Sequence, residues 1–379
     1  MSQNMDVLRR SVREFAEVEV KPLAKKIDEE NVMPESLLRR AAEMGFFALR
    51  VPEKYGGPGL SLPESVVVVE ELSRASSALG VISAVSGSTA VYPILAYGGE
   101  ELREKYLGIL AKGGIAAFAL TEPCCGTDAA AITTRVVKEG DEYVVTGEKI
   151  FITGASYADF FLTAVRTGRL EDRHRGISLL VVEKGPCVEI SKLEMMGYRG
   201  SGTSAVRFDE CRVPADNLVG EENRGFKYLM MALNEGRIVA SATGLGIMEA
   251  AFEEALNYSQ ERTSMGKPII EHQMVQYMIA EMAVLLEATR LLIYEAARRF
   301  EEGDPEIPRY SSMAKLHTAK ASVELVRMAM QVLGGIGYSK DSVVERLYRD
   351  AKMLEIGDGT NEAQRIVIVK SLLGRVRAA

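Results

Sequence analysis

The chain has 379 residues, of which 47% are apolar and 26% are charged, and its formal net charge is −7. This length indicates two or three domains at roughly 150 residues per domain, and the apolar fraction excludes a wholly disordered chain. The excess of acidic over basic residues and the lack of a basic block argue against a nucleic-acid-binding protein.

The first third of the chain has a helical pattern that loop signals interrupt. Pro34 begins a predicted helix, and PEKYGGPG at residues 52–59 predicts a loop. Residues 76–99 carry no charge, but their serines, glycines and Pro93 are not typical of a membrane-spanning helix. We therefore predict that this stretch is a buried helix and that the chain has no membrane span.

From about residue 113 to residue 225 the pattern changes to short β-type runs. The first two runs flank the polar segment EGDE and predict a hairpin. Because no helical segments alternate with these runs, we expect a compact antiparallel sheet or barrel and not a βαβ arrangement. The runs are residues 134–138, 143–146, 160–165, 177–182 and 205–208.

From about residue 226 the hydrophobic period is again close to that of a helix. Met274, Met278, Met282, Leu285 and Leu292 form one apolar stripe, with charged residues on the other side. Four or five helices fit before residue 375, which is enough for a bundle. We predict an α+β fold, mostly α, with a helical domain at 1–112, a β-domain at 113–225 and a helical bundle at 226–379.

The four cysteines and three histidines suggest neither a metal site nor a disulfide scaffold. No CxxC pair occurs and the histidines are scattered. Cys124 and Cys125 are adjacent, whereas Cys187 and Cys211 stand far apart. We therefore expect reduced cysteines and a cytoplasmic location, with Cys125 as a small buried thiol without a redox role.

One loop segment has a composition that suits a cofactor. ALTEPCCGTD at residues 119–128 contains a threonine, a Gly-Thr pair and backbone amides that could bind a phosphate or the polar edge of a flavin. A plain turn capped by Asp128 explains the same residues. GGIG at residues 334–337 follows a predicted helix and not a strand, so a Rossmann dinucleotide site is unsupported.

Further segments, in a fixed order, resemble one known family. QVLGGIGY at 331–338, ERLYRDAK at 345–352 and IGDGTNEAQR at 356–365 resemble the two signature segments of the acyl-CoA dehydrogenases. The other matches are EKIFIT at 148–153, MGYRGSGT at 196–203, Gly236-Arg237, and ERT at 261–263 with Gln273.

This resemblance runs nearly end to end, and it implies the helix–sheet–helix layout derived above. It also implies an FAD-dependent enzyme, usually a homotetramer, that makes a 2-enoyl-CoA from an acyl-CoA and passes the electrons to an electron-transfer flavoprotein. In such enzymes the reaction belongs to fatty-acid β-oxidation.

The same resemblance assigns cofactor ligands residue by residue. The loop after residue 118 would hold the isoalloxazine edge, and the Phe-x-Thr element would pack on the flavin. Arg262 and Gln273 would reach the FAD of a neighbouring subunit, because a planar guanidinium suits a pyrophosphate. The predicted cofactor residues are Phe118, Leu120, Thr121, Gly126, Thr127, Phe151, Thr153, Arg262, Gln273, Gln331, Gly334, Gly335, Thr360 and Glu362.

The catalytic position departs from the commonest family pattern. Most members carry a Glu in Tyr-Glu-Gly-Thr that removes the α-proton of the thioester, and here residues 357–360 read GDGT, so Asp358 takes its place. Aspartate is one methylene shorter, which costs about 1–1.5 Å of reach. The plain alternative is that Asp358 caps the following helix. Some relatives carry the base at the position of Gly236, which leaves only Glu235 nearby as a strained substitute.

Thr127, Asn234, Arg237 and Gly359 are the predicted substrate contacts. The leading hypothesis is an acyl-CoA dehydrogenase with Asp358 as its base, and a branched or alicyclic acyl group is a refinement because some ring-oxidising relatives carry Asp. One alternative is a flavin oxidase resembling nitroalkane oxidase, which also uses an Asp base. A second alternative is a non-catalytic protein that binds FAD and acyl-CoA.

Overall fold

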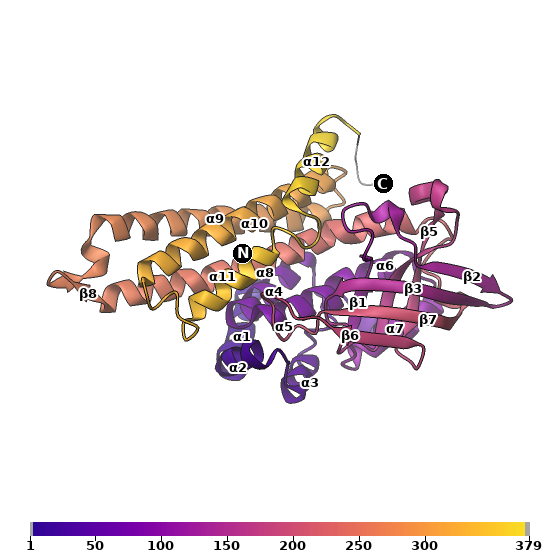
Figure 1. Cartoon of the computed structure of the whole chain (residues 1–379), viewed down its shortest axis with the longest axis horizontal. Helices are drawn as coiled ribbons and strands as arrows, with labels where there is room; N and C mark the ends of the chain where they lie inside the picture. Colours follow the sequence, from indigo (N-terminus) through magenta and orange to yellow (C-terminus); the bar gives the residue numbers. More distant parts are fainter. Residues whose placement is uncertain (1–2, 376–379) are drawn as a thin grey trace.

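The computed structural model describes residues 3–375. In chain order, helices come before and after a curled sheet, and Figure 1 shows this sheet at one end of the molecule, with α9 and α10 extending toward the other. The predicted α+β fold with a mostly helical composition is therefore confirmed. The domain boundaries stay predictions, although the change from helix to strand falls between Ala111 and Ala116 and the return to helix at Gly225.

The N-terminal region packs its helices around α4 (Leu62–Ala75), which begins with a capping box. The Ser61 amide donates to Glu64 Oε2 over 2.8 Å, and the Ser61 hydroxyl accepts from the Glu64 amide, so the first turn of α4 has its free donors satisfied. The other helices are α1 (Gln3–Phe15), α2 (Ala24–Glu30), α3 (Glu35–Glu43), α5 (Ser77–Ala84), α6 (Val91–Tyr97) and α7 (Glu100–Ala111).

The uncharged stretch is a core element, but it is not one continuous α-helix. A π-helical turn, η4 (Val85–Thr89), separates α5 from α6. Ser77–Tyr97 is long and apolar enough to cross a membrane by composition, yet 83% of its most apolar window is buried inside the protein. Burial of this kind is typical of a core helix, and it agrees with the predicted absence of a membrane span.

The β-domain is a seven-stranded sheet in the order β1-β4-β2-β3-β7-β6, with β5 on β4. The predicted hairpin is present as β2 against β3. The prediction of a purely antiparallel sheet is wrong, because β1 pairs with β4 in parallel. The strands are β1 (Ala116–Ala119), β2 (Arg135–Glu139), β3 (Glu142–Ile152), β4 (Phe160–Arg166), β5 (Ile177–Glu183), β6 (Val188–Lys192) and β7 (Ser204–Pro214).

Strand β4 connects the sheet to the helices on either side. Phe160 and Leu162 face a core shared with the N-terminal helices, whereas Phe161 and Val165 face the core inside the β-domain. Successive side chains of a strand point to opposite faces, so a strand buried on both faces is mostly apolar, as β4 is apart from Thr163 and Arg166. This packing holds β1, and the loop that follows it, against the helical part of the molecule.

The C-terminal region has five helices within the described residues, as predicted. Residues 234–248 of α8 are all buried, which marks α8 as the central helix of the bundle. On the predicted apolar stripe Met282 is fully buried, but Met274 is 74% exposed. The helices are α8 (Gly225–Glu261), α9 (Gln273–Glu301), α10 (Ile307–Leu333), α11 (Val343–Met353) and α12 (Asn361–Leu372), with a small hairpin of β8 (Thr263–Ser264) and β9 (Lys267–Pro268) between α8 and α9.

The expectation of four reduced cysteines is wrong for this structure. Cys124 is bonded to Cys125, and Cys187 is bonded to Cys211. The second pair joins the loop before β6 to β7, where antiparallel pairing of these strands brings together two cysteines that are far apart in the sequence. The sequence separation of Cys187 and Cys211 therefore did not reveal their contact.

Candidate active site

Asp358 lies in the loop between α11 and α12, in a backbone conformation that few side chains adopt. Its φ is 52° and that of Gly359 is 88°, so both residues are left-handed. The alternative that Asp358 caps α12 is wrong, because the Thr360 hydroxyl accepts from the Ala363 amide at 3.2 Å and provides the cap. Among the described residues, the Asp358 carboxylate has no hydrogen-bond or ion-pair partner, so it is available to a substrate.

Two side chains hold the Asp358-Gly359 backbone. Lys315 of α10 is 2% exposed, and its Nζ donates to the Gly359 carbonyl at 2.6 Å. Gln364 Nε2 donates to the Asp358 carbonyl at 3.1 Å and to the Gly359 carbonyl at 2.9 Å. A Cβ at residue 359 would lie 2.7 Å from Gln364 Nε2, so glycine is required there for space as well as for its φ.

Asp358 shares a buried environment with two cations. Burial raises the pKa of Asp358, and the positive charges of Lys315 and Arg237 act in the opposite direction. Burial also lowers the pKa of Lys315 to about 8 and that of Arg237 to about 10, and in each case the Asp358 charge opposes the change. A carboxylate near two cations stays ionised more easily than an isolated buried one.

The predicted substrate residues of α8 form one polar cluster. Arg237 Nη1 donates to Asn234 Oδ1 at 2.9 Å, and the Ser311 hydroxyl donates to the same oxygen at 3.3 Å. Asn234 and Arg237 are both buried, and Arg237 Nε has no partner among the described residues. An unused buried donor costs stability, so Arg237 has unfilled capacity for an acceptor that this chain does not supply.

Glu235 points to a different set of partners. It is fully buried, accepts a hydrogen bond from the Ser88 hydroxyl and lies 3.5 Å from Arg50 Nε. Burial raises the pKa of Glu235 to about 7. Since neither Asp358 nor Arg237 is among these partners, the geometry gives no support to Glu235 as a substitute base.

The segment at residues 119–128 is a loop that a buried ion pair anchors to strand β3. Lys149 of β3 is fully buried, and its Nζ donates to Glu122 Oε1 at 2.8 Å and to the Leu120 carbonyl at 3.0 Å. The Thr133 and Thr134 amides also donate to Glu122, and its pKa falls to about 2 despite burial because of Lys149 and these donors. The anchored carboxylate fixes the start of the loop.

The surroundings of this loop fit a flat aromatic cofactor. Phe151 of β3 is 56% exposed with a left-handed φ of 58°, and Phe118 of β1 is half-buried. The hydroxyls of Thr121, Thr127 and Thr153 have no hydrogen-bond partner within the described residues. An exposed large aromatic with several unused hydroxyls is typical of a ligand surface.

The remaining predicted cofactor residues lie elsewhere. Arg262 directly precedes β8 and Gln273 begins α9, and Figure 1 places this hairpin at the opposite end of the molecule from the sheet. Gln331, Gly334 and Gly335 are exposed at the end of α10, which packs on α9. A Cβ at either glycine would meet no atom within 4 Å. Within one chain, the predicted cofactor residues of the β-domain and those beside the β8–β9 hairpin therefore lie apart.

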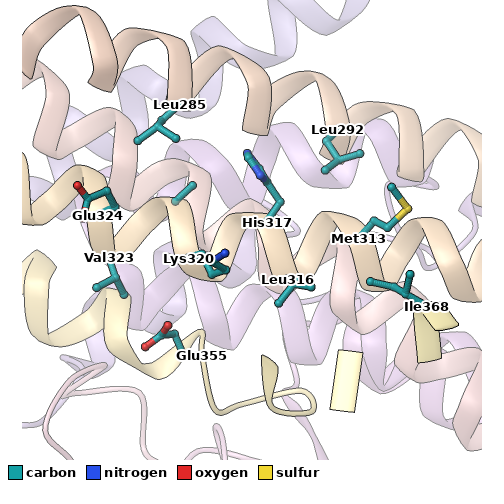
Figure 2. Close-up of a pocket in the computed structure, with 11 residues that line it drawn as sticks. Leu285, Leu292, Met313, Leu316, His317, Lys320, Val323, Glu324, Glu355 and Ile368 are labelled. Carbon is teal, nitrogen blue, oxygen red and sulfur yellow. The ribbon is translucent and has the colours of Figure 1, made fainter. Parts of the chain in front are cut away.

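One cavity lies on the helical bundle and not at Asp358. It has a volume of about 700 Å³ and lies between α9, α10 and α12. Figure 2 shows Leu285 and Leu292 of α9 directed toward His317 of α10. Glu355 also lines the cavity, only three residues before Asp358, so the cavity adjoins the active-site loop.

Sequence reasoning missed Lys315, Glu122 and Lys149. A signal for Lys315 was present, because it falls on the buried face of α10 together with Ala314 and Thr318, where a lysine needs a specific partner. Glu122 lies inside the recognised loop, but nothing in the sequence pairs it with Lys149. That pairing depends on how β3 crosses the loop.

Comparison with known proteins gives a consistent result along the chain. Three family models match: the acyl-CoA dehydrogenase N-terminal domain at residues 2–114, the middle domain at 117–211 and the C-terminal domain at 223–373. An acyl-CoA dehydrogenase of Bacillus subtilis is 41% identical over 377 residues, covering 99% of each chain.

Two solved structures share the whole architecture. The butyryl-CoA dehydrogenase of Megasphaera elsdenii is 33% identical with a TM-score of 0.95, and the match covers 98% of this chain and 99% of the other. A chain from a structure of an electron transferring flavoprotein of Acidaminococcus fermentans is 37% identical with a TM-score of 0.95, covering 98% of both chains.

Proposed function

This chain is an FAD-dependent oxidoreductase of the acyl-CoA dehydrogenase family, and from that premise we propose that it converts an acyl-CoA thioester to the 2-enoyl-CoA with Asp358 as its base. The observation that carries this proposal is the unpartnered Asp358 carboxylate beside two buried cations. An ionised, unpartnered carboxylate can accept a proton from the α-carbon, and its loop is held rigidly enough to present it.

Removal of the α-proton requires that the thioester carbonyl be polarised, because that proton is only weakly acidic. The backbone N–H groups of Asp358 and Gly359 donate to no acceptor within the described part of the chain, and they can stabilise the negative charge that develops on the carbonyl oxygen. Bound FAD supplies the acceptor for the hydride that leaves the β-carbon. Phe118, Thr121, Thr127, Phe151 and Thr153 would hold its ring, with unused hydroxyls as hydrogen-bonding groups.

The phosphate groups of coenzyme A are anionic, and a basic segment adjoins the flavin loop. The segment η6 (Leu170–Gly176), which is kinked at Arg173, contains Arg173, His174 and Arg175. Arg173 Nη2 donates to both carboxylate oxygens of Asp128 at 2.7 and 2.9 Å, so η6 is tied to the end of the loop. Exposed guanidinium groups bind phosphates well, which supports a CoA thioester over a small nitroalkane as substrate.

We further propose a branched or alicyclic acyl group and an electron-transfer flavoprotein as the electron acceptor. The shorter Asp358 favours a substrate whose α-carbon lies closer to the loop. The likeness to a chain from an electron transferring flavoprotein structure supports the acceptor.

We also propose a homotetramer, because the predicted FAD ligands form two sets at opposite ends of one chain. A neighbouring subunit would bring Arg262 and Gln273 to the flavin held by the β-domain. The surface of the bundle supports self-association, since exposed large apolar residues lie on or next to α9, α10 and α12, the helices that also line the cavity of Figure 2. They are Met274, Tyr277, Val284, Leu291, Met313, Ile366, Val369, Leu372 and Leu373.

Anaerobic titration of the purified flavoprotein with a panel of acyl-CoAs tests the function. We expect loss of the oxidised flavin absorbance with at least one branched, alicyclic or short straight-chain acyl-CoA. Oxygen consumption with a nitroalkane, without bleaching by any acyl-CoA, would instead identify an oxidase. Tight acyl-CoA binding that leaves the flavin fully oxidised would identify a non-catalytic binding protein.

A further inference from the structure

The two adjacent cysteines form the tip of a closed turn in the flavin loop. The Cys125 amide donates to the Glu122 carbonyl at 3.0 Å, and the Glu122 amide donates to the Cys125 carbonyl at 3.3 Å. Cys124 is exposed and Cys125 is 6% exposed, and a disulfide joins them. One sulfur of the pair is therefore accessible from solvent, while the other faces the protein.

The two sides of this turn differ in how firmly they are held. On one side, Glu122 is fixed by Lys149 and by the Thr133 and Thr134 amides, none of which involves a cysteine. On the other side come Gly126 and Thr127, which are exposed; a Cβ at Gly126 would meet no atom within 4 Å, and the Thr127 hydroxyl has no hydrogen bond within the described residues. The ion pair of Glu122 with Lys149 does not depend on the disulfide, so a change at Cys124–Cys125 acts on the turn itself, which continues directly into Gly126 and Thr127.

We propose that Cys124 and Cys125 form a reversible thiol–disulfide switch that controls how the flavin loop holds FAD. This inference rests on the proposed function, because that function makes Gly126 and Thr127 cofactor ligands. In a reducing compartment the pair would be two thiols, and an oxidising small-molecule disulfide would close the ring.

The exchange is balanced in sulfur, protons and electrons. The accessible Cys124 thiolate attacks one sulfur of a disulfide RSSR, forms a mixed disulfide and releases RS⁻. The Cys125 thiol then loses its proton and attacks the Cys124 sulfur, which closes the intramolecular bond and releases a second RS⁻. The cysteine pair loses two electrons and RSSR gains them, so a dithiol reductant reverses the reaction.

The expected effect on FAD follows from the freedom of the loop. The closed ring removes rotations between Cys124 and Cys125, so fewer conformations must be lost when the loop binds FAD. Reduction restores those rotations. We expect the dissociation constant for FAD to rise on the order of 3–10-fold in the reduced protein, because preorganisation contributes to affinity by lowering the entropy cost of binding.

The test uses the full-length flavoprotein, equilibrated with either oxidised glutathione or dithiothreitol. Alkylation and peptide mass spectrometry count the free thiols at 124–125, and recovery of free FAD fluorescence gives the FAD affinity in each state. We expect thiols at both positions only after reduction, together with the weaker FAD binding. After reduction, phenylarsine oxide should bind the pair with one arsenic per chain, since adjacent thiols chelate it.

Two single variants distinguish the pair from the other disulfide. Cys124→Ser should bind FAD with the affinity of the reduced protein under both conditions. Cys187→Ser opens the disulfide between Cys187 and Cys211 of β7, and it should show the same difference in FAD affinity between the oxidised and reduced states as the wild type. Equal FAD affinity in the oxidised and reduced wild type, or a response to reductant that persists in Cys124→Ser, would overturn the proposal. Thiol counting and FAD affinity do not depend on acyl-CoA turnover, so a failure here is distinct from a failure of the proposed function.

Discussion

At the scale of single residues, the chemistry depends on a short acid in an unusual backbone conformation. Asp358 has a positive φ, and a non-glycine residue there is disfavoured unless the surroundings hold it. Lys315 and Gln364 supply that support through the carbonyls on either side of the Asp358–Gly359 junction. The strained position therefore coincides with the residue that the sequence identified as catalytic.

Replacing Asp358 by Asn should abolish proton abstraction without loss of FAD. The amide keeps the size of the side chain but cannot accept the α-proton, and general-base catalysis contributes about 10²–10⁴-fold to rate. Stopped-flow measurement of flavin bleaching by acyl-CoA would show a loss of that order or more, while the visible spectrum of the bound flavin stays. Bleaching at the wild-type rate would remove Asp358 from the mechanism.

Lys315 is predicted to set the pH dependence of the reaction. Its charge lowers the pKa of Asp358, so Lys315→Met should raise that pKa further. Because proton abstraction needs the unprotonated acid, the acid limb of the kcat/KM profile should move to higher pH when this nearby positive charge is lost. Lys315→Arg retains the charge and should leave the limb near its wild-type position. An unmoved limb in Lys315→Met would limit this residue to a structural role.

At the scale of elements, the flavin loop depends on strand β3 for its position. Lys149 reaches from β3 to both Glu122 and the Leu120 carbonyl, so one buried cation ties two points of the loop to the sheet. Burial lowers the pKa of Lys149 to about 8, which reflects the cost of a charge without water. The attraction of the Glu122 carboxylate for the Lys149 ammonium group offsets this cost.

Lys149→Met should destabilise the protein strongly, because it leaves the Glu122 carboxylate buried without its cation. Removing one partner of a buried ion pair typically lowers the free energy of unfolding by about 3–5 kcal/mol. Urea unfolding followed by circular dichroism measures the free energy of unfolding. The double variant Lys149→Met with Glu122→Gln is the matched control and should lose less than the single variant. A loss under about 1 kcal/mol in Lys149→Met would show that the pair does not hold the loop.

At the scale of the whole molecule, the predicted FAD ligands form two sets at opposite ends of the chain. The flavin loop belongs to the β-domain, whereas Arg262 and Gln273 flank the hairpin at the far end of the bundle. A folded chain of this shape cannot bring both sets to one FAD. Assembly is therefore required to complete the site that we propose.

This division predicts complementation between two inactive variants. Asp358→Asn removes the base, and Arg262→Ala removes a predicted contact to the FAD of the neighbouring subunit. In a mixed pair one site carries both changes and the other carries neither, so random mixing should restore about a quarter of the wild-type sites. Co-expression of the two variants followed by activity assay measures this. Activity no greater than that of the separate variants would show that one chain contributes both Arg262 and Asp358 to a site.

Local patterns in the sequence were sufficient for the helix–sheet–helix order and for the family. Helical and β-type hydrophobic periods depend on neighbours within a few residues, so they can be read directly, as the hairpin of β2 and β3 illustrates. The same applies to Asp358, which stands within a local motif. The parallel pairing of β1 with β4 could not be read in this way, because register between distant strands is set by packing.

The sequence by itself determined the elements, the family and the identity of the candidate base. Only the tertiary structure decided which groups surround that base: Lys315 comes from another helix, 43 residues before Asp358, and Arg237 from a third. It also decided that Cys187 meets Cys211. The physical reason is that charge interactions and side-chain contacts depend on distance in space, and the chain brings residues from different elements together only when it folds.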